Sequence, residues 1–460
     1  MPLILGANTL SAGGYEVDNS CRFNRDSSDY LSRTPASSGN RRTWTFSTWV
    51  KRSSLTGNQD LITSGSALQV VSYIYFYTAN GIFAFEEYTG GYQINIKSNA
   101  YLRDLSAWYN LIIAVDTTQG TASNRIKMYI NGNQVTSLSA TTYPSQNFEC
   151  NINSNTLHNI GCEQNGTNCI DGYLAETVFI DGLQLGEDSF GEFDEDSGIW
   201  KPIDVSGLTF GTNGFYLEFK DSSALGDDTS DNTNDWTVNN LTSIDQTTDT
   251  PTNNFATMNP LDKTPFGTSI TYSDGNTTTT ASAGTDWTTR YSFSSLAITQ
   301  GKWYAECKVG NVGVSNQFYV GVIKDRQTAS ISTSLGGIAN GYGYYANTGN
   351  IVNNGVDLST SGASYTTNNI IGMALDLDNG TLDFYKDGVA QGDQVTGLDT
   401  SALWQFANNA YQNAIWNWNF GNPPFAITTG NEDANGYGNF EHEVPSGYYA
   451  LCTKNLAEYG

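Results

Sequence analysis

Three acidic side chains alternate in the segment EFDED at 192–196. On a β-strand, Glu192, Asp194 and Asp196 would share one face. Paired carboxylates on one face act as nucleophile and acid/base in glycoside hydrolysis. Ser197 and Gly198 follow at once, which indicates a turn, and charged side chains are normally solvated. The sequence therefore favours an exposed acidic turn and predicts no catalytic residue.

The sequence also lacks the residue patterns of other enzyme classes. The chain has two histidines, His158 and His442, and neither lies beside a nucleophile-elbow sequence. No zinc-type cysteine pairing and no glycine-rich phosphate loop before a helix is present. We expect a protein that is not an enzyme and that needs no cofactor.

A weaker candidate for chemistry is a calcium site in the segment 221–249, which is rich in Asp and lacks Lys and Arg. Hard carboxylate oxygens are the ligands that Ca²⁺ prefers. The spacing is not that of an EF-hand, and Asp residues commonly cap their own turns. A solvated loop is the favoured interpretation, with these aspartates as the alternative metal ligands: Asp227, Asp228, Asp231 and Asp235.

Composition limits the partners. The chain has 460 residues, 13% aromatic and only 15% charged, with a net charge of −25. Such acidity disfavours nucleic acid and anionic membrane surfaces. No run approaches the ~20 apolar residues of a membrane span, so we expect no membrane insertion. Of six cysteines, Cys162 and Cys169 flank a turn-rich segment and can face each other across a hairpin. Whether they form a disulfide stays open.

Alternating strand patterns, which could position the candidate residues named above, recur throughout the chain. No sustained helical periodicity is present. The clearest in the first half are at 42–50, 107–116 and 125–130. Asn131-Gly132 and Asp181-Gly182 predict hairpin turns. The second half repeats the pattern, with turns at 378–380 and 386–388. These spacings predict an all-β protein of two tandem antiparallel sandwiches of the jelly-roll type.

The predicted domain boundaries follow composition. We expect a short N-terminal docking segment at 1–15 and a first sandwich at 16–245. A linker at 246–262 contains Pro251 and Pro260 and has little apolar content. A second sandwich at 263–460 completes the chain.

The first half resembles the laminin-G/concanavalin A-like jelly roll. The stretches that carry the resemblance are WTFSTWV at 44–50, WYNLIIAVD at 108–116, NRIKMYING at 124–132 and DGYLAE at 171–176. The resemblance covers about residues 15–220. Some laminin-G-like domains bind Ca²⁺, which is what makes the Asp-rich segment a candidate.

The second half resembles a SPRY domain, another concanavalin-like sandwich. The matching stretches are KWYAECKV at 302–309, YVGV at 319–322, GYGY at 341–344 and IIGMALDLDNGTLDFYKDG at 370–388. Leu382 and Phe384 are expected on one strand face, after a turn that needs Gly380 in the left-handed region. SPRY-like domains bind partners through loops at one end of the sandwich.

The combination of the two domains with DEDSGIWKP at 194–202 and PSGYYALCTKNL at 445–456 resembles structural proteins of tailed phages, especially marine ones. That resemblance implies a virion protein, made in the host cytoplasm and then exposed outside the cell. Its expected partners are other virion proteins and a copy of itself in a homo-oligomer.

Aromatic residues are the remaining candidates for ligand contact. Tyr and Trp faces pack against sugar C–H groups while Asn and Asp fix hydroxyls. Trp303, Tyr304, Trp416 and Trp418 are expected in the core. The candidate contact residues, which lie nearer to predicted loops, are Tyr345, Tyr411 and Asn413.

Three functions remain open. The favoured one is a non-catalytic virion appendage, such as a tail fibre or receptor-binding protein, that contacts host-surface glycan or protein through sandwich loops. The second is a purely architectural decoration or joining protein of the virion. The third is a glycan-active enzyme on a concanavalin-like fold, for which Glu192 and Asp194 would be the test positions.

Overall fold

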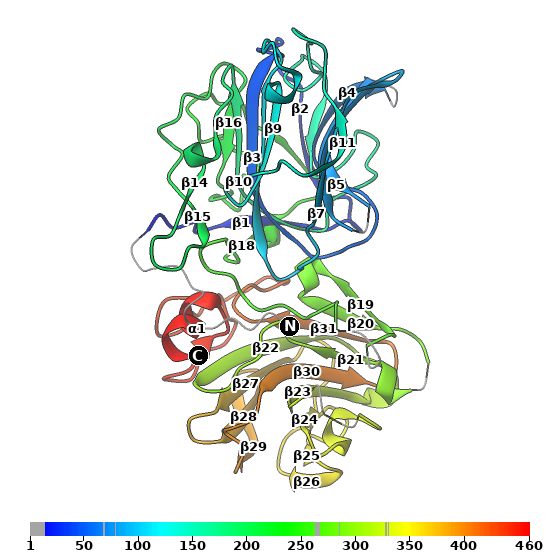
Figure 1. The fold of residues 1–460 in the computed structure, drawn as a ribbon. Coiled ribbons are helices and arrows are strands. Elements are labelled where there is room, and N and C mark those ends of the chain that lie inside the picture. The colour runs from blue at the N-terminus through cyan, green and yellow to red at the C-terminus, as the bar shows by residue number, and fades with distance from the viewer. Residues whose placement is uncertain are drawn as a thin grey trace. The chain divides into compact units, whose positions relative to one another are not determined.

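The computed structural model describes residues 14–67, 70–78, 80–262, 267–284, 286–326, 329 and 331–460. They form two compact all-β units, residues 14–252 and Asn253–Gly460, which we call the first and second sandwich (Figure 1). The described pairing is antiparallel apart from β32, which runs parallel to β22, and an isolated parallel bridge between Asp60 and Cys169. The predicted all-β fold of two antiparallel sandwiches is confirmed. No helix among the described residues is long and apolar enough to cross a membrane.

The first sandwich consists of two sheets and a small ribbon. Sheet I has the strand order β10 (Asn133–Gln134), β9 (Ile126–Ile130), β8 (Trp108–Asp116), β3 (Thr43–Arg52), β13 (Gly172–Asp181), β1 (Ser20–Phe23) and β18 (Gln246–Thr247), with β16 (Phe215–Leu217) also on β13. Sheet II has the order β11 (Leu138–Thr142), β7 (Tyr92–Tyr101), β6 (Ile82–Thr89), β5 (Val70–Tyr77), β4 (Gln59–Ala67), β12 (His158–Ile160), β2 (Tyr30–Arg33) and β17 (Thr237–Asn239). The ribbon pairs β14 (Gly191–Phe193) with β15 (Trp200–Pro202).

Alternation along each strand decides which side chains fill this core. On β3, Trp44 and Phe46 point between the sheets, as the period of two predicts. On β8 the same holds for Leu111 and Ile113, whereas Ile112 lies on the outer face of sheet I. A second apolar cluster covers that outer face, built by residues from the loops that follow β13: Phe190, Val205 and Phe210. Sheet I is therefore buried on both faces.

The second sandwich also has two sheets. Sheet III has the order β19 (Ile270–Ser273), β20 (Thr278–Ala281), β31 (Ala414–Asn419), β22 (Lys302–Val312), β27 (Ile370–Asp376), β28 (Thr381–Lys386) and β29 (Val389–Thr396), with β32 (Tyr449–Ala450) beside β22. Sheet IV has the order β21 (Tyr291–Phe293), β30 (Trp404–Ala410), β23 (Phe318–Lys324), β24 (Gly341–Tyr345), β25 (Ile351–Asn353) and β26 (Val356–Ser359). Helix α1 (Thr453–Tyr459) follows β32.

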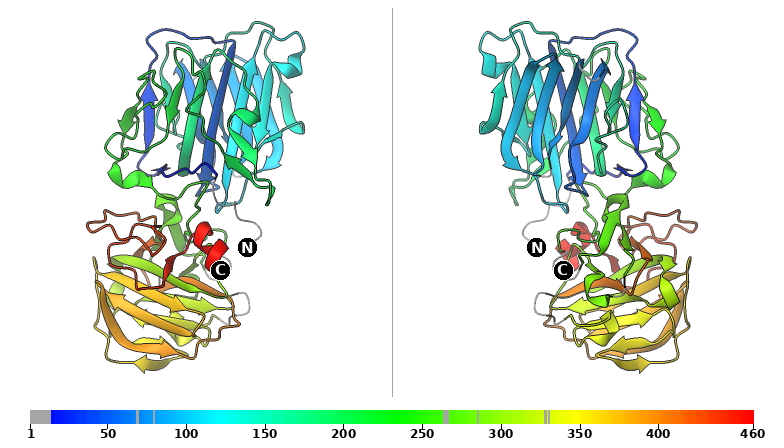
Figure 2. Two further views of the ribbon diagram at one scale, coloured as in Figure 1. Left: turned by 90° about the vertical axis from the view of Figure 1, so that its left-hand side faces the viewer. Right: turned by 90° about the vertical axis from the view of Figure 1, so that its right-hand side faces the viewer.

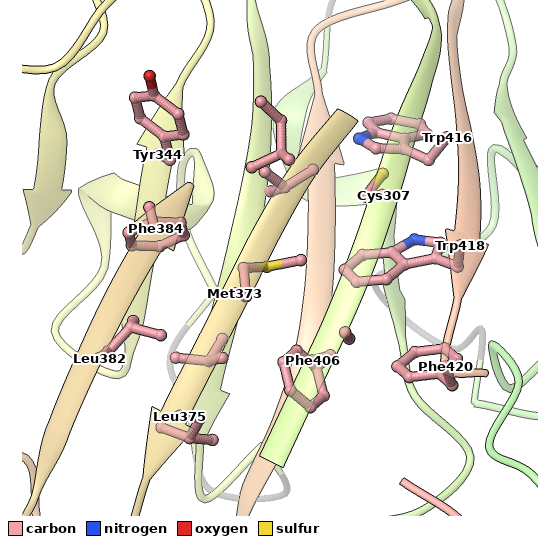
Figure 3. Packing of buried hydrophobic residues seen from close by; sticks show 14 of the residues in the cluster. Cys307, Tyr344, Met373, Leu375, Leu382, Phe384, Phe406, Trp416, Trp418 and Phe420 are labelled. Atoms are coloured by element: carbon pink, nitrogen blue, oxygen red, sulfur yellow. The ribbon is translucent and has the colours of Figure 1, made fainter. Parts of the chain in front are cut away.

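The second core is rich in aromatic rings (Figure 3). Leu382 and Phe384 both point into it from β28, as predicted, and Trp418 stacks on Phe420 with centroids 5.4 Å apart. The four side chains expected in the interior are all at most 1% exposed: Trp303, Tyr304, Trp416 and Trp418. Tyr304 differs in packing on the opposite face of sheet III, against Phe440.

Two of the predicted turns have the backbone that their sequences require. Asn131 and Gly132 both adopt positive φ, 46° and 71°, between β9 and β10. Gly380 has φ 67° between β27 and β28. The Asp181-Gly182 hairpin prediction is wrong, because β13 ends at Asp181 and the next strand, β14, pairs with β15 instead of with β13. The Asp181 carboxylate instead accepts hydrogen bonds from the backbone N–H groups of Asn40 and Asn213.

The segment predicted as a linker, 246–262, is divided between the two sandwiches. Gln246 and Thr247 form β18 at the edge of sheet I. Phe255 forms a bridge with Cys452, and Met258 forms one with Ser294, in the second sandwich. Of the predicted docking segment 1–15, residues 1–13 lie outside the described residues.

Candidate functional site

Four aromatic side chains form a continuous row at one end of sheet IV. We call the following residues the aromatic row: Tyr345 at the end of β24, Tyr319 near the start of β23, Trp287 in the 3-10 turn η6 (Trp287–Thr289), and Tyr411 directly after β30. The centroids of Tyr345 and Tyr319 lie 4.5 Å apart with nearly parallel rings. Trp287 lies 5.8 Å from Tyr319 and 5.5 Å from Tyr411. The row thus joins two of the three predicted contact residues, Tyr345 and Tyr411.

The alternation and register of the strands explain why the rings meet. Phe318 and Val320 point into the core, so Tyr319 between them points to the opposite face. The antiparallel register places Tyr319 directly opposite Tyr345. Directly opposed residues in an antiparallel pair have their side chains in contact, which explains the stacking.

Two hydrogen bonds hold the short turn that carries Trp287. The Asp286 carboxylate accepts from the Thr288 backbone N–H at 2.9 Å, which caps the turn. Asn409, which lies opposite Tyr319 on β30, donates through Nδ2 to the Trp287 carbonyl at 2.9 Å. These bonds fix the backbone of the turn that carries the tryptophan.

The row presents ring faces and hydroxyl groups, and no cation belongs to it. Tyr319 is 7% exposed, and burial raises the pKa of its phenol to about 12, so this hydroxyl stays neutral at physiological pH. Tyr345, Trp287 and Tyr411 are each half-buried. Half-exposed aromatic rings with hydroxyl groups suit sugar C–H faces or apolar side chains of a partner.

Asn413, the third predicted contact residue, lies at the tip between β30 and β31. Its side chain is exposed and its φ is 54°. Its backbone N–H donates to the Ser282 carbonyl at 3.4 Å, which ties the tip to the strand β20 end. The tip thus places an exposed amide two residues beyond Tyr411.

Sequence reasoning missed Trp287 and Tyr319. The signal for Tyr319 is present in the alternation FYVGV at 318–322, which sends Tyr319 to the face opposite its neighbours. The signal for Trp287 is the Asp that precedes it at a turn start. Neither signal says that the two rings meet, because that depends on the pairing of β30 with β23.

Two of the four aspartates considered for calcium serve the loop that contains them. Asp228 accepts hydrogen bonds from the backbone N–H groups of Tyr216, Ser230 and Asn234, and Asp235 accepts one from Asp228. Asp227 and Asp231 are exposed. Within the described ranges no group of three or more His, Cys, Asp or Glu side chains is arranged to hold a metal ion.

The acidic segment at 192–196 also serves a turn. Asp194 is 1% exposed and accepts hydrogen bonds from the backbone and hydroxyl of Ser197, at 2.9 and 2.8 Å. Lys201 lies 3.4 Å from Glu192 and 3.3 Å from Asp194. Asp194 therefore closes the turn between β14 and β15. An acidic turn is present as predicted, but the expectation that it is exposed is wrong for Asp194, which is buried because it holds the turn closed.

His158 and two of the cysteines have structural roles. Burial lowers the pKa of His158 to about 4, and its Nε2 accepts a hydrogen bond from the Asn153 backbone N–H at 3.1 Å. Cys162 and Cys169 form a disulfide that closes a short loop beside sheet II. This answers the pairing that the sequence left open.

Comparison with known families agrees with the two sandwiches. Residues 25–183 match the laminin-G family described as the concanavalin A-like lectin/glucanases superfamily, and residues 302–420 match the SPRY domain. The chain therefore carries a laminin-G/concanavalin A-like domain followed by a SPRY domain. No curated protein sequence matches the chain.

Solved structures similar to the chain each cover about a third of it. The SPRY domain of human HERC1 shares 18% identity, over 31% of this chain and 86% of its own, with a TM-score of 0.26. A human SPRY domain shares 13%, over 35% and 98%, with 0.27. A heptameric SAP-like pentraxin from Limulus polyphemus shares 13%, over 37% and 80%, with 0.29.

Proposed function

We propose that the protein is a non-catalytic recognition component of a virus particle, which contacts a host-surface glycan or protein through the aromatic row. The observation that carries the proposal is the row itself, four rings in contact with three of them half-exposed. Tyr and Trp in this situation supply large contact area at little conformational cost.

The assignment to a virion is supported by sequence stretches outside the two family matches. The segments at 194–202 and 445–456 are the ones that resemble tailed-phage structural proteins. Single sites of this kind bind weakly, since a millimolar dissociation constant corresponds to only about 4 kcal/mol. Several copies on one appendage would supply the avidity that a single row lacks.

The test compares host-surface binding of the full chain with that of the double variant Tyr345→Ala, Tyr411→Ala. We expect a loss of roughly tenfold or more, because two ring contacts are removed. Phe193→Ala, which truncates a 48% exposed ring on β14, is the matched control and should bind normally. Equal binding by the double variant and the control would refute the role of the row.

Particle location is tested separately, by antibody labelling of purified virions and by deletion of residues 1–15. The proposal expects label on an exposed appendage and loss of incorporation on deletion. Purified particles that carry no label would contradict it.

A second candidate, the architectural protein, is favoured by one observation. Val356 and Leu358 on β26 and Val389 on β29 are 58%, 43% and 64% exposed, on strands at the edges of their sheets. Exposed apolar side chains on edge strands suit contacts with other subunits. Cross-linking that captures these strands in intact particles, with host binding unaffected by the double variant, would favour this candidate.

A further inference from the structure

The most deeply buried ion pair among the described residues joins Lys51 to Asp249 in the first sandwich. Lys51 Nζ lies 2.6 Å from Asp249 Oδ2, and the two side chains are 1% and 0% exposed. In every other described ion pair that contains a lysine, the lysine side chain is at least 13% exposed. Removing two charges from water is costly, and their mutual attraction often fails to offset that cost. A reaction that removes both charges would relieve it.

The strand register places the Lys51 amine among aromatic rings. Val50 points into the core, so Lys51 points to the outer side of sheet I, as Trp49 does. Trp108 on β8 and Tyr173 on β13 lie directly opposite Lys51 on the two neighbouring strands. The left-hand view of Figure 2 shows β3 in blue between β13 in green and β8 in cyan. Lys51 Nζ lies 5.5 Å from the centre of the Tyr173 ring, in surroundings that bulk water does not reach.

The Asp249 carboxylate is held in place from both sides. Asp249 follows β18, and its backbone carbonyl accepts a hydrogen bond from the Ser20 hydroxyl at 2.6 Å. Its backbone N–H donates to the Thr247 hydroxyl oxygen at 3.1 Å. The indole Nε1 of Trp108 donates to Asp249 Oδ1 at 3.1 Å. One carboxylate oxygen therefore faces the amine while the other receives the indole N–H.

This arrangement has the parts that amide formation needs. Transfer of one proton from the Lys51 ammonium to Oδ2 converts the ion pair into a neutral amine and a carboxylic acid, which burial favours. The amine nitrogen, held against the carboxyl group, then attacks the carboxyl carbon Cγ. The negative charge that develops on Oδ1 is stabilised by the Trp108 N–H.

The reaction balances without any further reagent. After a second proton passes from the nitrogen to Oδ2, that oxygen leaves as water. The bond formed is Nζ–Cγ and the bond broken is Cγ–Oδ2. Nothing is oxidised or reduced, so the folded chain itself supplies every group that the step uses.

We propose that Lys51 and Asp249 condense to an amide, which makes this pair a site of covalent self-modification. The bond joins β3 to the segment that follows β18, across a sequence separation of 198. A cross-link over such a length restricts the unfolded chain far more than the folded one. The first sandwich is thereby closed covalently between one of its central strands and the end of its chain segment.

The pair of Lys302 and Asp376 on sheet III is a matched control within the same chain. Its Nζ–Oδ2 distance is 2.9 Å, but the Lys302 side chain is 33% exposed. Asp376 Oδ1 accepts from the backbone N–H groups of Asp378 and Asn379, which favours the charged carboxylate. Water also solvates the ammonium and keeps it charged, so this pair stays ionic.

The experiment measures the intact mass of the purified full chain by mass spectrometry, after reduction of the disulfide. We expect a mass one water below the value for the sequence. Trypsin should fail to cleave after Lys51 and should release one branched peptide that contains Lys51 and Asp249, whereas Lys302 and Asp376 should stay in separate peptides. Lys51→Arg keeps the cation and removes the amine nucleophile, so this variant should have the full sequence mass.

A time course tests the role of the indole. After cell-free synthesis, the cross-linked fraction of Trp108→Phe should grow roughly a hundredfold more slowly than that of the unchanged chain. Equal rates would overturn the role given to the Trp108 N–H.

The unchanged chain decides the proposal, so variants that fail to fold do not. A folded chain with the full sequence mass that trypsin cleaves after Lys51 would overturn it. So would a loss of water that Lys51→Arg retains, or one that maps to a different aspartate, because an aspartate can also lose water by cyclising onto its own backbone.

Discussion

The two sandwiches differ in how far other segments cover the outer faces of their sheets. In the second, a cluster that includes Leu335 and Ile338 covers the outer face of sheet IV, and one that includes Phe440 and Val444 covers that of sheet III. The half-exposed rings of the aromatic row lie at the strand ends, beside the cluster on sheet IV. In the first, the outer side of sheet II carries tyrosine side chains, of which Tyr73 and Tyr77 are half-buried and Tyr75 is 4% exposed. Sandwiches of one fold class can thus differ in which side chains they leave open, and the covering segments decide which.

The largest effect is expected from truncating a core ring in one sandwich at a time. Trp44→Ala in the first and Trp418→Ala in the second should each cost about 3–5 kcal/mol of unfolding free energy, because both rings are fully buried. Differential scanning calorimetry should show each variant lowering a different transition. A single transition that moves equally with either variant would show that the sandwiches do not unfold separately.

Acid should stabilise both sandwiches through one buried carboxyl in each. Burial raises the pKa of Glu176 and of Glu306 to about 7. Because each folded-state pKa exceeds the unfolded value near 4.5, the stabilisation is complete below pH 4.5 and is lost as the pH rises through 7. The unfolding free energy should change by an amount on the order of 3 kcal/mol per group.

The matched variants are Glu176→Gln and Glu306→Gln. Each should flatten the pH dependence of the melting temperature between pH 4.5 and 7, and only for the transition of its own sandwich. Thermal melts across that pH range measure this. Glu306 accepts from the backbone N–H groups of Glu441 and His442, and Glu176 from the hydroxyls of Tyr15 and Tyr216, so the amide keeps an acceptor in both cases. An unchanged pH profile in either variant would assign the titration to other groups.

Removal of the disulfide should affect the first sandwich alone. Cys162→Ser with Cys169→Ser releases a loop of sequence separation 7, which costs roughly 2 kcal/mol by chain entropy. The melting temperature of the first transition should fall while the second stays in place. The buried, unbridged Cys307→Ser is the control for loss of a thiol, and it should affect only the second.

The smallest effects should come from the exposed aromatic rings. Tyr345→Ala removes a ring stacked on Tyr319 and should cost about 1 kcal/mol in the second sandwich. Tyr92→Ala should cost less in the first, because its side chain is 52% exposed. Urea denaturation resolves differences of this size when the two variants are compared with the unchanged chain. A larger loss for Tyr92 would mean that it supports the fold more than its exposure indicates.

Much of the fold could be predicted from local sequence. Alternation in residues 44–50 and 108–116 identified the buried strands of sheet I, and Asn131-Gly132 identified a tight turn. Both signals are local and follow from strand geometry. Asp181-Gly182 failed because a turn dipeptide does not reveal whether a strand follows, and here the carboxylate bonds to residues far away in the chain.

The candidate sites depend on pairing between distant strands, which the sequence does not show. Tyr345 and Tyr411 were selected from their nearness to loops, but their connection runs through Tyr319 and Trp287. The outward position of the β5 tyrosines escaped notice because YIYFY at 73–77 reads as an ordinary buried strand. The side to which they point is known only when the opposite sheet and the covering loops are placed.

The disulfide beside sheet II connects the order of a surface loop with the redox state of the surroundings. In a reducing solution Cys162 and Cys169 stay thiols, so the loop that bears Glu163 is released from its closure. The carboxylate that accepts from the Tyr73 hydroxyl is then held less firmly. Oxidation restores the closure, so the order of this loop reports whether the chain has met an oxidising environment.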